Sequence, residues 1–218
     1  MIARSLALLA TAALVAACAE PPHLARTAAP TTALPPQSAA PVAALALFDA
    51  HLHYSEPAWR LYPPERALAI LRDAGVRRAL VSSTPDDGTV RLYEASLRLA
   101  QQSGQEGAAE IVVPILRPYR TPEDLATWTQ DPTIVPYLEG RLARGIYRGI
   151  GEFHLSAPQT TSPVVRAVVR LALERDLVLH VHGDDQAVEE LARLDGRARI
   201  LWAHAGMSAG PERVRRLV

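Results

Sequence analysis

The sequence predicts an α/β fold in which parallel strands alternate with helices. Short runs rich in Val, Ile and Leu recur from residue 45 onward, and each is followed by an amphipathic stretch. Several of these stretches begin near a proline or end at a glycine, which is typical of helix boundaries. Strands that alternate with helices in this way pair in parallel through right-handed crossovers.

The first half of this pattern contains three strand and helix units. Prolines near the start and a glycine after the end mark the first helix, and the second helix again finishes at a glycine. The third strand leads into two shorter helical pieces. The expected elements are strand 45–54, helix 63–75, strand 76–84, helix 89–104, strand 110–119, and the helical pieces 121–130 and 134–145.

The second half repeats the pattern three more times, with apolar strands such as "LVLHVHGD" and amphipathic helices such as "QAVEELARLD". Periodicity alone does not distinguish an open doubly wound sheet from a closed eight-stranded barrel. The expected elements are strand 147–155, helix 162–176, strand 177–184, helix 186–195, strand 198–206 and a helical segment at 210–218.

The first 18 residues have the pattern of a bacterial export signal. Arg4 precedes an apolar run that is too short to span a bilayer comfortably, and small residues lie ahead of Cys18, the only cysteine. "VAAC" resembles the lipobox of bacterial lipoproteins, which implies that Cys18 is lipidated and begins the mature protein. The alternatives are a plain signal peptide and a buried N-terminal helix. We therefore expect an exported, membrane-anchored lipoprotein that faces the periplasm or another extracytoplasmic surface.

Composition separates the rest of the chain into a tether and a domain. Residues 19–44 are rich in Ala, Pro, Thr and Ser and lack periodicity, which predicts a disordered tether. Residues 45–218 are long enough for one sizeable core. With a single cysteine, no intramolecular disulfide can form, so the fold must be held by its core.

The charged residues exclude several functions. The 23 basic and 23 acidic residues balance, so no sequence-wide positive field attracts nucleic acid, and we expect no nucleic-acid partner. Every basic residue is arginine, and the chain contains no lysine. Schiff-base chemistry, pyridoxal phosphate attachment and lysine-bridged metal centres are therefore excluded. A small-molecule substrate is expected, and a homo-oligomer is compatible with the sequence.

Histidines recur at the carboxyl ends of four expected strands, where barrel enzymes build their active sites. An open sheet would spread these side chains along a line, whereas a barrel gathers them around one axis. The pattern therefore favours a (β/α)8 TIM-barrel-type parallel barrel, with about six of the eight β/α units in this sequence. In strand order the histidines are His51 and His53, His154, His180 and His182, and His204.

The pair His51 and His53 forms half of a candidate metal site. Residues i and i+2 of a strand project to the same side and lie roughly 7 Å apart at the backbone. Their imidazoles can lean together to share one ion at about 2.0–2.1 Å from each nitrogen. The alternative is two half-buried histidines that are hydrogen-bonded to neighbouring carbonyl groups.

The fourth strand supplies a second such pair, Glu152 and His154. A carboxylate beside histidines at a strand end is a natural terminal or bridging ligand, and the charge of the ion would stabilise its anionic form. The alternative for Glu152 is an ion pair with an arginine such as Arg148, which is close in sequence. His154 is either a substrate contact or a structural hydrogen-bonding group.

The last two strands complete the candidate set. Of His180 and His182, one is expected to bind metal and the other to support it or line the pocket. We favour His182, because it lies nearer the strand end and precedes the turn residues "GDD". His204 is followed by Gly206, which allows a tight turn over the metal, and is a candidate ligand or transition-state contact.

Taken together, these motifs resemble those of the amidohydrolase superfamily of metal-dependent hydrolases. "FDAHLH" resembles its strand-one motif, "GIGEFH" its strand-four acid, and "LHVHGD" and "WAHAG" its strand-five and strand-six histidines, over roughly residues 46–207. The resemblance implies one or two divalent ions, commonly zinc, that activate water for attack on an ester, amide, lactone or phosphoester bond. The metal ligands or polarising groups that it implies are His51, His53, Glu152, His182 or His180, and His204. We take His204 and His154 as the catalytic candidates.

The family also places an aspartate at the end of an eighth strand, and the sequence contains no counterpart of strands seven and eight. We expect a barrel that is truncated at its carboxyl end. The alternatives are a partner chain that completes the barrel and a degenerate, non-catalytic protein that binds a metal or small ligand. A decarboxylase or hydratase on the same barrel is a further alternative.

Overall fold

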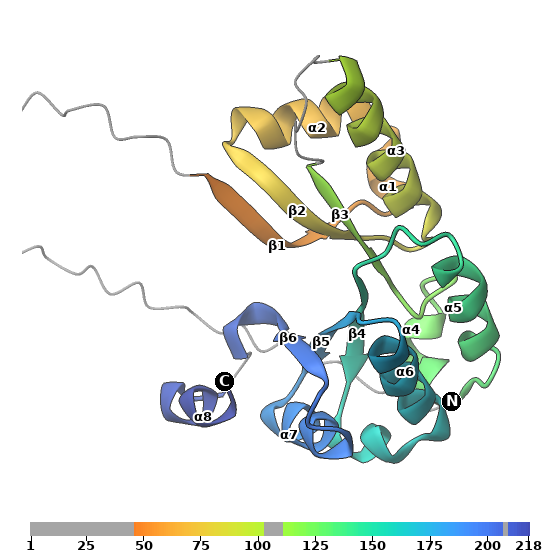
Figure 1. The fold of residues 1–218 in the computed structure, drawn as a ribbon, viewed down its shortest axis with the longest axis vertical. Helices are drawn as coiled ribbons and strands as arrows, with labels where there is room; N and C mark the ends of the chain where they lie inside the picture. Colours follow the sequence, from red (N-terminus) through yellow and green to blue (C-terminus); the bar gives the residue numbers. More distant parts are fainter. Residues whose placement is uncertain (1–45, 103–110, 207–208) are drawn as a thin grey trace, which may run out of the picture. The chain divides into compact units, whose positions relative to one another are not determined.

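Six parallel strands form one curled sheet, in which each strand lies beside its neighbour in the chain (Figure 1). The computed structural model describes residues 46–102, 111–206 and 209–218. The expected signal peptide, tether and Cys18 lie outside the described residues. The strands are β1 (Leu47–His53), β2 (Val76–Ser82), β3 (Val112–Leu116), β4 (Gly149–Leu155), β5 (Val178–Gly183) and β6 (Arg199–Trp202).

The order of the sheet agrees with a barrel type of winding. Doubly wound sheets reverse their strand order at a switch point, which creates their ligand crevice. Here the order runs from β1 to β6 without reversal, and every pairing is parallel. The parallel α/β class expected from the sequence is confirmed, and the sheet curls as a half-barrel compatible with part of a TIM-like barrel (Figure 1).

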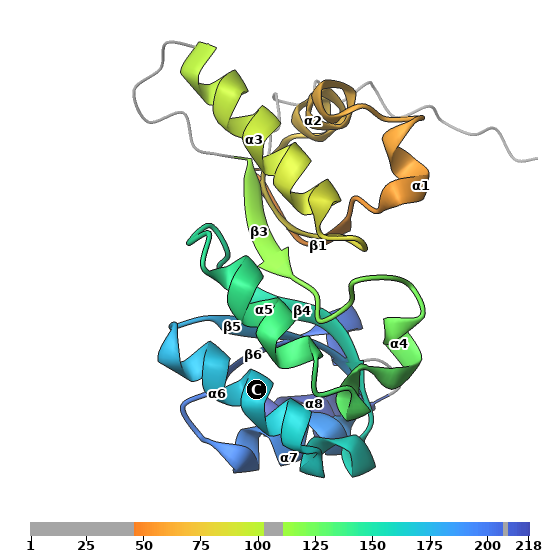
Figure 2. The same cartoon turned by 90° about the vertical axis from the view of Figure 1, so that its right-hand side faces the viewer.

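Each strand is followed in the chain by one or more helices (Figure 2). The helices that pack against strands of the sheet are α2, α3, α5, α6 and α7. Helix α6 illustrates why the helices form: its apolar residues recur at helical spacing, and the Ser162 hydroxyl accepts a hydrogen bond from the backbone N–H of Val164 at its start. The helices are α1 (Glu56–Trp59), α2 (Pro64–Asp73), α3 (Asp87–Gln102), α4 (Asp124–Thr127), α5 (Ile134–Leu142), α6 (Pro163–Glu174), α7 (Asp185–Leu194) and α8 (Pro211–Leu217). The short 3-10 helices are η1 (Trp128–Gln130), η2 (Ala157–Thr161) and η3 (Ala203–Gly206).

Two clusters of buried apolar side chains support the sheet. One surrounds Leu68, Val81 and Leu92, between strands β1 to β3 and helices α2 and α3. The larger one includes Trp128 and Phe153, between strands β3 to β6 and helices α5 to α7. Burial of this apolar surface is the main favourable contribution to folding, and it holds the strand ends in place. Among the described residues, no helix has the length and apolarity needed to cross a membrane.

The sixth strand differs from the prediction. It ends at Trp202 rather than at residue 206, and the following residues form η3. The Trp202 indole N–H donates to the carbonyl oxygen of Gly183, 2.8 Å away, which fixes the strand end against β5. The sequence pattern also did not predict α1 or η2, because each is too short to show a helical period.

Candidate metal centre

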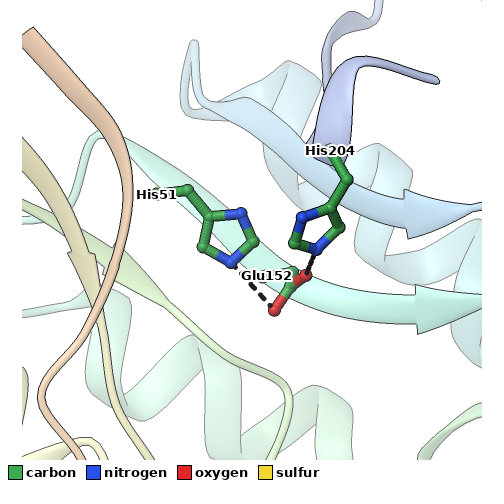
Figure 3. Close-up of side chains that lie close together, drawn as sticks. All are labelled: His51, Glu152 and His204. Carbon is green, nitrogen blue, oxygen red and sulfur yellow. Dashed lines mark ion pairs between the residues drawn. The ribbon is translucent and has the colours of Figure 1, made fainter. Parts of the chain in front are cut away.

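Glu152, on β4, lies at the centre of the histidine cluster. Its side chain is only 3% exposed, and both of its oxygens face imidazoles. Oε2 lies 3.0 Å from His53 Nε2 and 3.4 Å from His51 Nε2. Oε1 lies 2.8 Å from His182 Nδ1 and 3.3 Å from His204 Nε2. One buried carboxylate therefore joins side chains from β1, β5 and the turn after β6, and Figure 3 shows two of these contacts.

On β1, His51 and His53 point to one place. Their Nε2 atoms are 2.9 Å apart, as expected for residues i and i+2 of a strand that lean together. His53 Nδ1 lies 3.0 Å from the hydroxyl oxygen of Ser82, at the end of β2. In a metal-binding histidine, the ring nitrogen that does not bind the metal usually forms a hydrogen bond to a nearby polar group. The contact with Ser82 orients the ring of His53 so that Nε2 faces Glu152.

On β5, the two histidines occupy different environments. His182 Nδ1 contacts Glu152 directly, and its ring stacks on that of His154 at a centroid distance of 3.9 Å. His180 is buried, and its ring lies edge-on to that of His51 at 4.7 Å. Of the two, only His182 belongs to a described group whose ligand atoms can share an ion.

His204 reaches the site from η3 rather than from a strand. Its backbone adopts a left-handed conformation with φ of 57°, and its Nε2 lies 3.2 Å from His182 Nδ1. Gly206 has φ of 90°, and a Cβ atom there would lie 2.6 Å from Val214 Cγ2. The tight turn anticipated from Gly206 is thus present, and it carries an imidazole that is 46% exposed.

Among the described residues, two groups of potential ligands have donor atoms that lie within 4.8 Å of one another. The first is His51, Glu152 and His204, and the second is Glu152, His154 and His182. Glu152 is common to both groups, so its two oxygens can serve one ion or bridge two. Imidazole and carboxylate donors suit zinc and several other divalent transition metals, so the ligand set does not single out zinc.

The protonation states also fit a divalent cation. Burial lowers the pKa of His51 and of His154, and burial together with the charge of His51 lowers the pKa of His180 to about 4. These rings are therefore neutral at pH 7, with lone pairs available. Burial opposes ionisation of Glu152, but hydrogen bonds with His53 and His182 outweigh it and hold the pKa of this carboxyl well below its usual range. Neutral imidazoles and an ionised carboxylate are the forms that bind metal.

The arginine beside Glu152 is Arg117, which the sequence did not reveal as a site residue. Its Nη2 atom lies 3.6 Å from Glu152 Oε2, and its side chain is 10% exposed. Arg148, the arginine named from sequence proximity, is exposed and makes no ion pair with Glu152. Arg117 directly follows β3, so it lies at the carboxyl end of a strand, as the histidines do. That position in the sequence could have identified Arg117 as a candidate site residue.

A groove opens beside the second group of ligands. It has a volume of about 350 Å³ and lies at the carboxyl ends of β4 and β5, beside α4. His154 and His182 form part of its wall, together with apolar Leu125 and Leu155 and the polar residue Ser156. A larger cavity of about 510 Å³, along α6, has no histidine among its lining residues.

No protein-family model matches the chain, and the search of curated proteins returns no significant match. A buried carboxylate within reach of histidines from three other chain segments can hold a metal ion, and a groove of about 350 Å³ lies beside His154 and His182.

Proposed function

We propose that this protein is a metal-dependent hydrolase of the amidohydrolase type. It would use one or two divalent ions to activate water for attack on an ester, amide, lactone or phosphoester bond. The observation that carries the proposal is the position of Glu152, whose two oxygens contact imidazoles from both ends of the described sheet. Histidine and carboxylate ligands that leave room for water are typical of catalytic rather than structural metal sites.

Each residue has a role in this proposal. Glu152 holds or bridges the metal, and His51 and His53 bind it from β1. His182 binds from β5. When bound, the metal supplies Lewis acidity, which lowers the pKa of water and polarises the scissile bond. His204, which is half-exposed, and His154, which lines the groove, complete the two ligand groups and are also assigned to contact the substrate at the reacting bond.

We further propose that the described sheet is part of an eight-stranded barrel. Among the described residues, β1 pairs only with β2, and β6 only with β5, so both outer strands have a free edge. Such edges favour further strand pairing, which barrels achieve by closure. Two more strand and helix units, from a longer chain or from a partner, would close the barrel. Zinc as the ion, and export with a lipid anchor at Cys18, remain part of the proposal.

Hydrolysis assays with the metal-loaded protein test the proposed function. The substrates are simple esters, lactones, amides and phosphoesters, and the protein is loaded separately with zinc, cobalt and manganese. We expect hydrolysis of at least one class, its loss on chelation and its recovery when metal is returned. Glu152→Gln should be inactive, whereas the exposed control Arg148→Gln should match the wild type.

Two outcomes would redirect the proposal. Stoichiometric metal binding without hydrolysis of any class would indicate a non-catalytic binding protein. Release of carbon dioxide, or addition of water without bond cleavage, would indicate a decarboxylase or a hydratase. Product analysis by mass spectrometry distinguishes these reactions from hydrolysis.

A further inference from the structure

The carboxyl end of β4 lacks a strand partner on its β3 side. The ladder between β3 and β4 contains only the pairs Ile115 with Gly149 and Leu116 with Ile150. By contrast, β4 remains paired with β5 as far as Leu155. The backbone of Glu152 and His154 therefore needs other hydrogen-bonding partners on the β3 side, because buried N–H and C=O groups are rarely left unpaired.

Three buried side chains take the place of the missing strand. The Arg117 Nε–H donates to the carbonyl oxygen of Glu152 at 3.0 Å. The backbone N–H of His154 donates to the Tyr119 hydroxyl at 2.7 Å, and the Trp128 Nε1–H donates to the carbonyl oxygen of His154 at 2.9 Å. The backbone of two candidate ligands is thus held by side chains from the segment that follows β3.

Arg117 also acts on the side chain of Glu152. While Nε holds the backbone oxygen, Nη2 lies 3.6 Å from Oε2, and the guanidinium lies 4.7 Å from the centre of the Tyr119 ring. A planar guanidinium can make these contacts together because its donors are fixed in one fork, whereas a lysine ammonium cannot.

We propose that Arg117 is a positioning residue for the metal centre, and that Tyr119 acts with it. Arg117 fixes the backbone and the carboxylate of Glu152 in the orientation that a divalent ion requires, and Tyr119 fixes His154. The inference rests on the proposed metal site, but it does not depend on hydrolysis. It assigns the geometry of two ligands to residues that touch neither the metal nor the substrate.

Metal affinity measured for Arg117→Lys, Arg117→Met and Tyr119→Phe tests this role. The probe is cobalt, whose visible spectrum reports ligand geometry, with competition by zinc for affinity. We expect both Arg117 variants to bind the ion about 10–100-fold more weakly, the usual cost of losing an outer partner of a metal ligand. Their cobalt spectra should differ from that of the wild type. Arg148→Gln, which alters an exposed arginine, should change neither property.

The alternatives predict different results. If Arg117 acted only through its charge, Arg117→Lys would bind like the wild type, and Arg117→Met would bind more tightly because a repulsive cation is gone. If it served only to stabilise the fold, the variants would melt at lower temperature with unchanged affinity and cobalt spectra. Either result would overturn the proposal.

Tyr119→Phe keeps the aromatic ring and removes only the hydroxyl that accepts from His154. It therefore tests the positioning role even where the Arg117 variants do not fold, and we expect weaker binding with an altered cobalt spectrum. An unchanged spectrum and affinity in this folded variant would contradict the proposal. A wild-type protein that binds no cobalt or zinc would instead contradict the metal site itself, so the two failures are distinguishable.

Discussion

Ser82 lies directly behind His53, with its hydroxyl oxygen 3.0 Å from Nδ1 while Nε2 of the same ring lies 3.0 Å from Glu152 Oε2. One imidazole thus connects the end of β2 to the carboxylate of β4. The backbone oxygen of Ser82 also lies 3.3 Å from Nδ1, so the ring orientation is held from two sides. A residue with no apparent role in the sequence is placed where it can set the tautomer of a candidate ligand.

Ser82→Ala should weaken metal binding without preventing folding. The variant keeps the backbone contact to His53 but loses the hydroxyl, so we expect affinity for zinc to fall by about tenfold, at the lower end of outer-partner effects. Isothermal titration calorimetry measures this change. Ser96→Ala is the matched control, because the Ser96 hydroxyl is also buried but has no hydrogen-bonding partner. Equal loss in both variants would argue against the specific contact.

Gly151 should be essential for the fold next to the site. Its φ is 141°, and a Cβ atom there would lie 2.2 Å from the backbone oxygen of His180. Gly151→Ala should therefore lower the free energy of unfolding by more than about 3 kcal/mol, or prevent folding. Gly140→Ala, in α5, adds a methyl group that meets nothing within 4 Å and should stabilise the protein by about 0.5–1 kcal/mol. Urea denaturation of both variants tests the contrast.

The stability of the metal-free protein should fall on acidification because of His180. Burial, followed by the charge of His51, lowers the pKa of His180 from 6.5 to about 4. The unfolded chain regains the ordinary pKa and takes up protons that the folded chain does not. His180 therefore contributes on the order of 3 kcal/mol to the free energy of unfolding. This contribution is fully present above about pH 6.5 and is lost as the pH falls through about 4.

His180→Asn removes this titrating group. With chelator present, the free energy of unfolding of the variant should depend less steeply on pH between about 6.5 and 4 than that of the wild type. Comparison with the wild type cancels the groups that both proteins share, including Asp86, whose pKa burial raises and whose effect has the opposite sign. Parallel pH profiles for the two proteins would show that His180 does not contribute.

A buried hydrogen bond away from the metal centre gives an independent prediction for stability. The Tyr147 hydroxyl donates to the carboxylate of Asp86, and both residues are buried. Tyr147→Phe leaves the charged acceptor without this donor, so we expect a loss of about 1–3 kcal/mol in the free energy of unfolding. Metal content should be unchanged. A drop in metal content with intact stability would show that this pair is coupled to the site.

Part of the site follows from sequence because strand geometry is local. The spacing of His51 and His53 predicted that both would face one point, and their Nε2 atoms meet at 2.9 Å. The same rule places His180 and His182 on one side of β5, but it does not say which is deeper. That depends on the neighbouring strand, since His180 is level with Gly151, whereas His182 is level with His154 at the open end.

Other features depend on contacts between distant segments and leave no local pattern. Arg117 reaches Glu152 because the ladder between β3 and β4 contains only two residue pairs. The length of this ladder cannot be predicted from the periodicity of the sequence. His204 was expected at the end of a strand, but β6 ends earlier, at Trp202, whose indole N–H donates to the carbonyl oxygen of Gly183, the last residue of β5. The alternation of strands and helices is encoded locally, and the place where each strand stops is set by its neighbours.

Metal content after equilibrium dialysis shows whether Glu152 and its histidines form a metal centre. Wild-type protein dialysed against zinc, and then against buffer, should retain one or two equivalents per chain by mass spectrometry. Glu152→Gln should retain none, because the charge shared by both ligand groups is lost, whereas Arg148→Gln should retain the wild-type amount. Absence of bound metal in the wild type, or equal retention by Glu152→Gln, would contradict a metal centre built on Glu152.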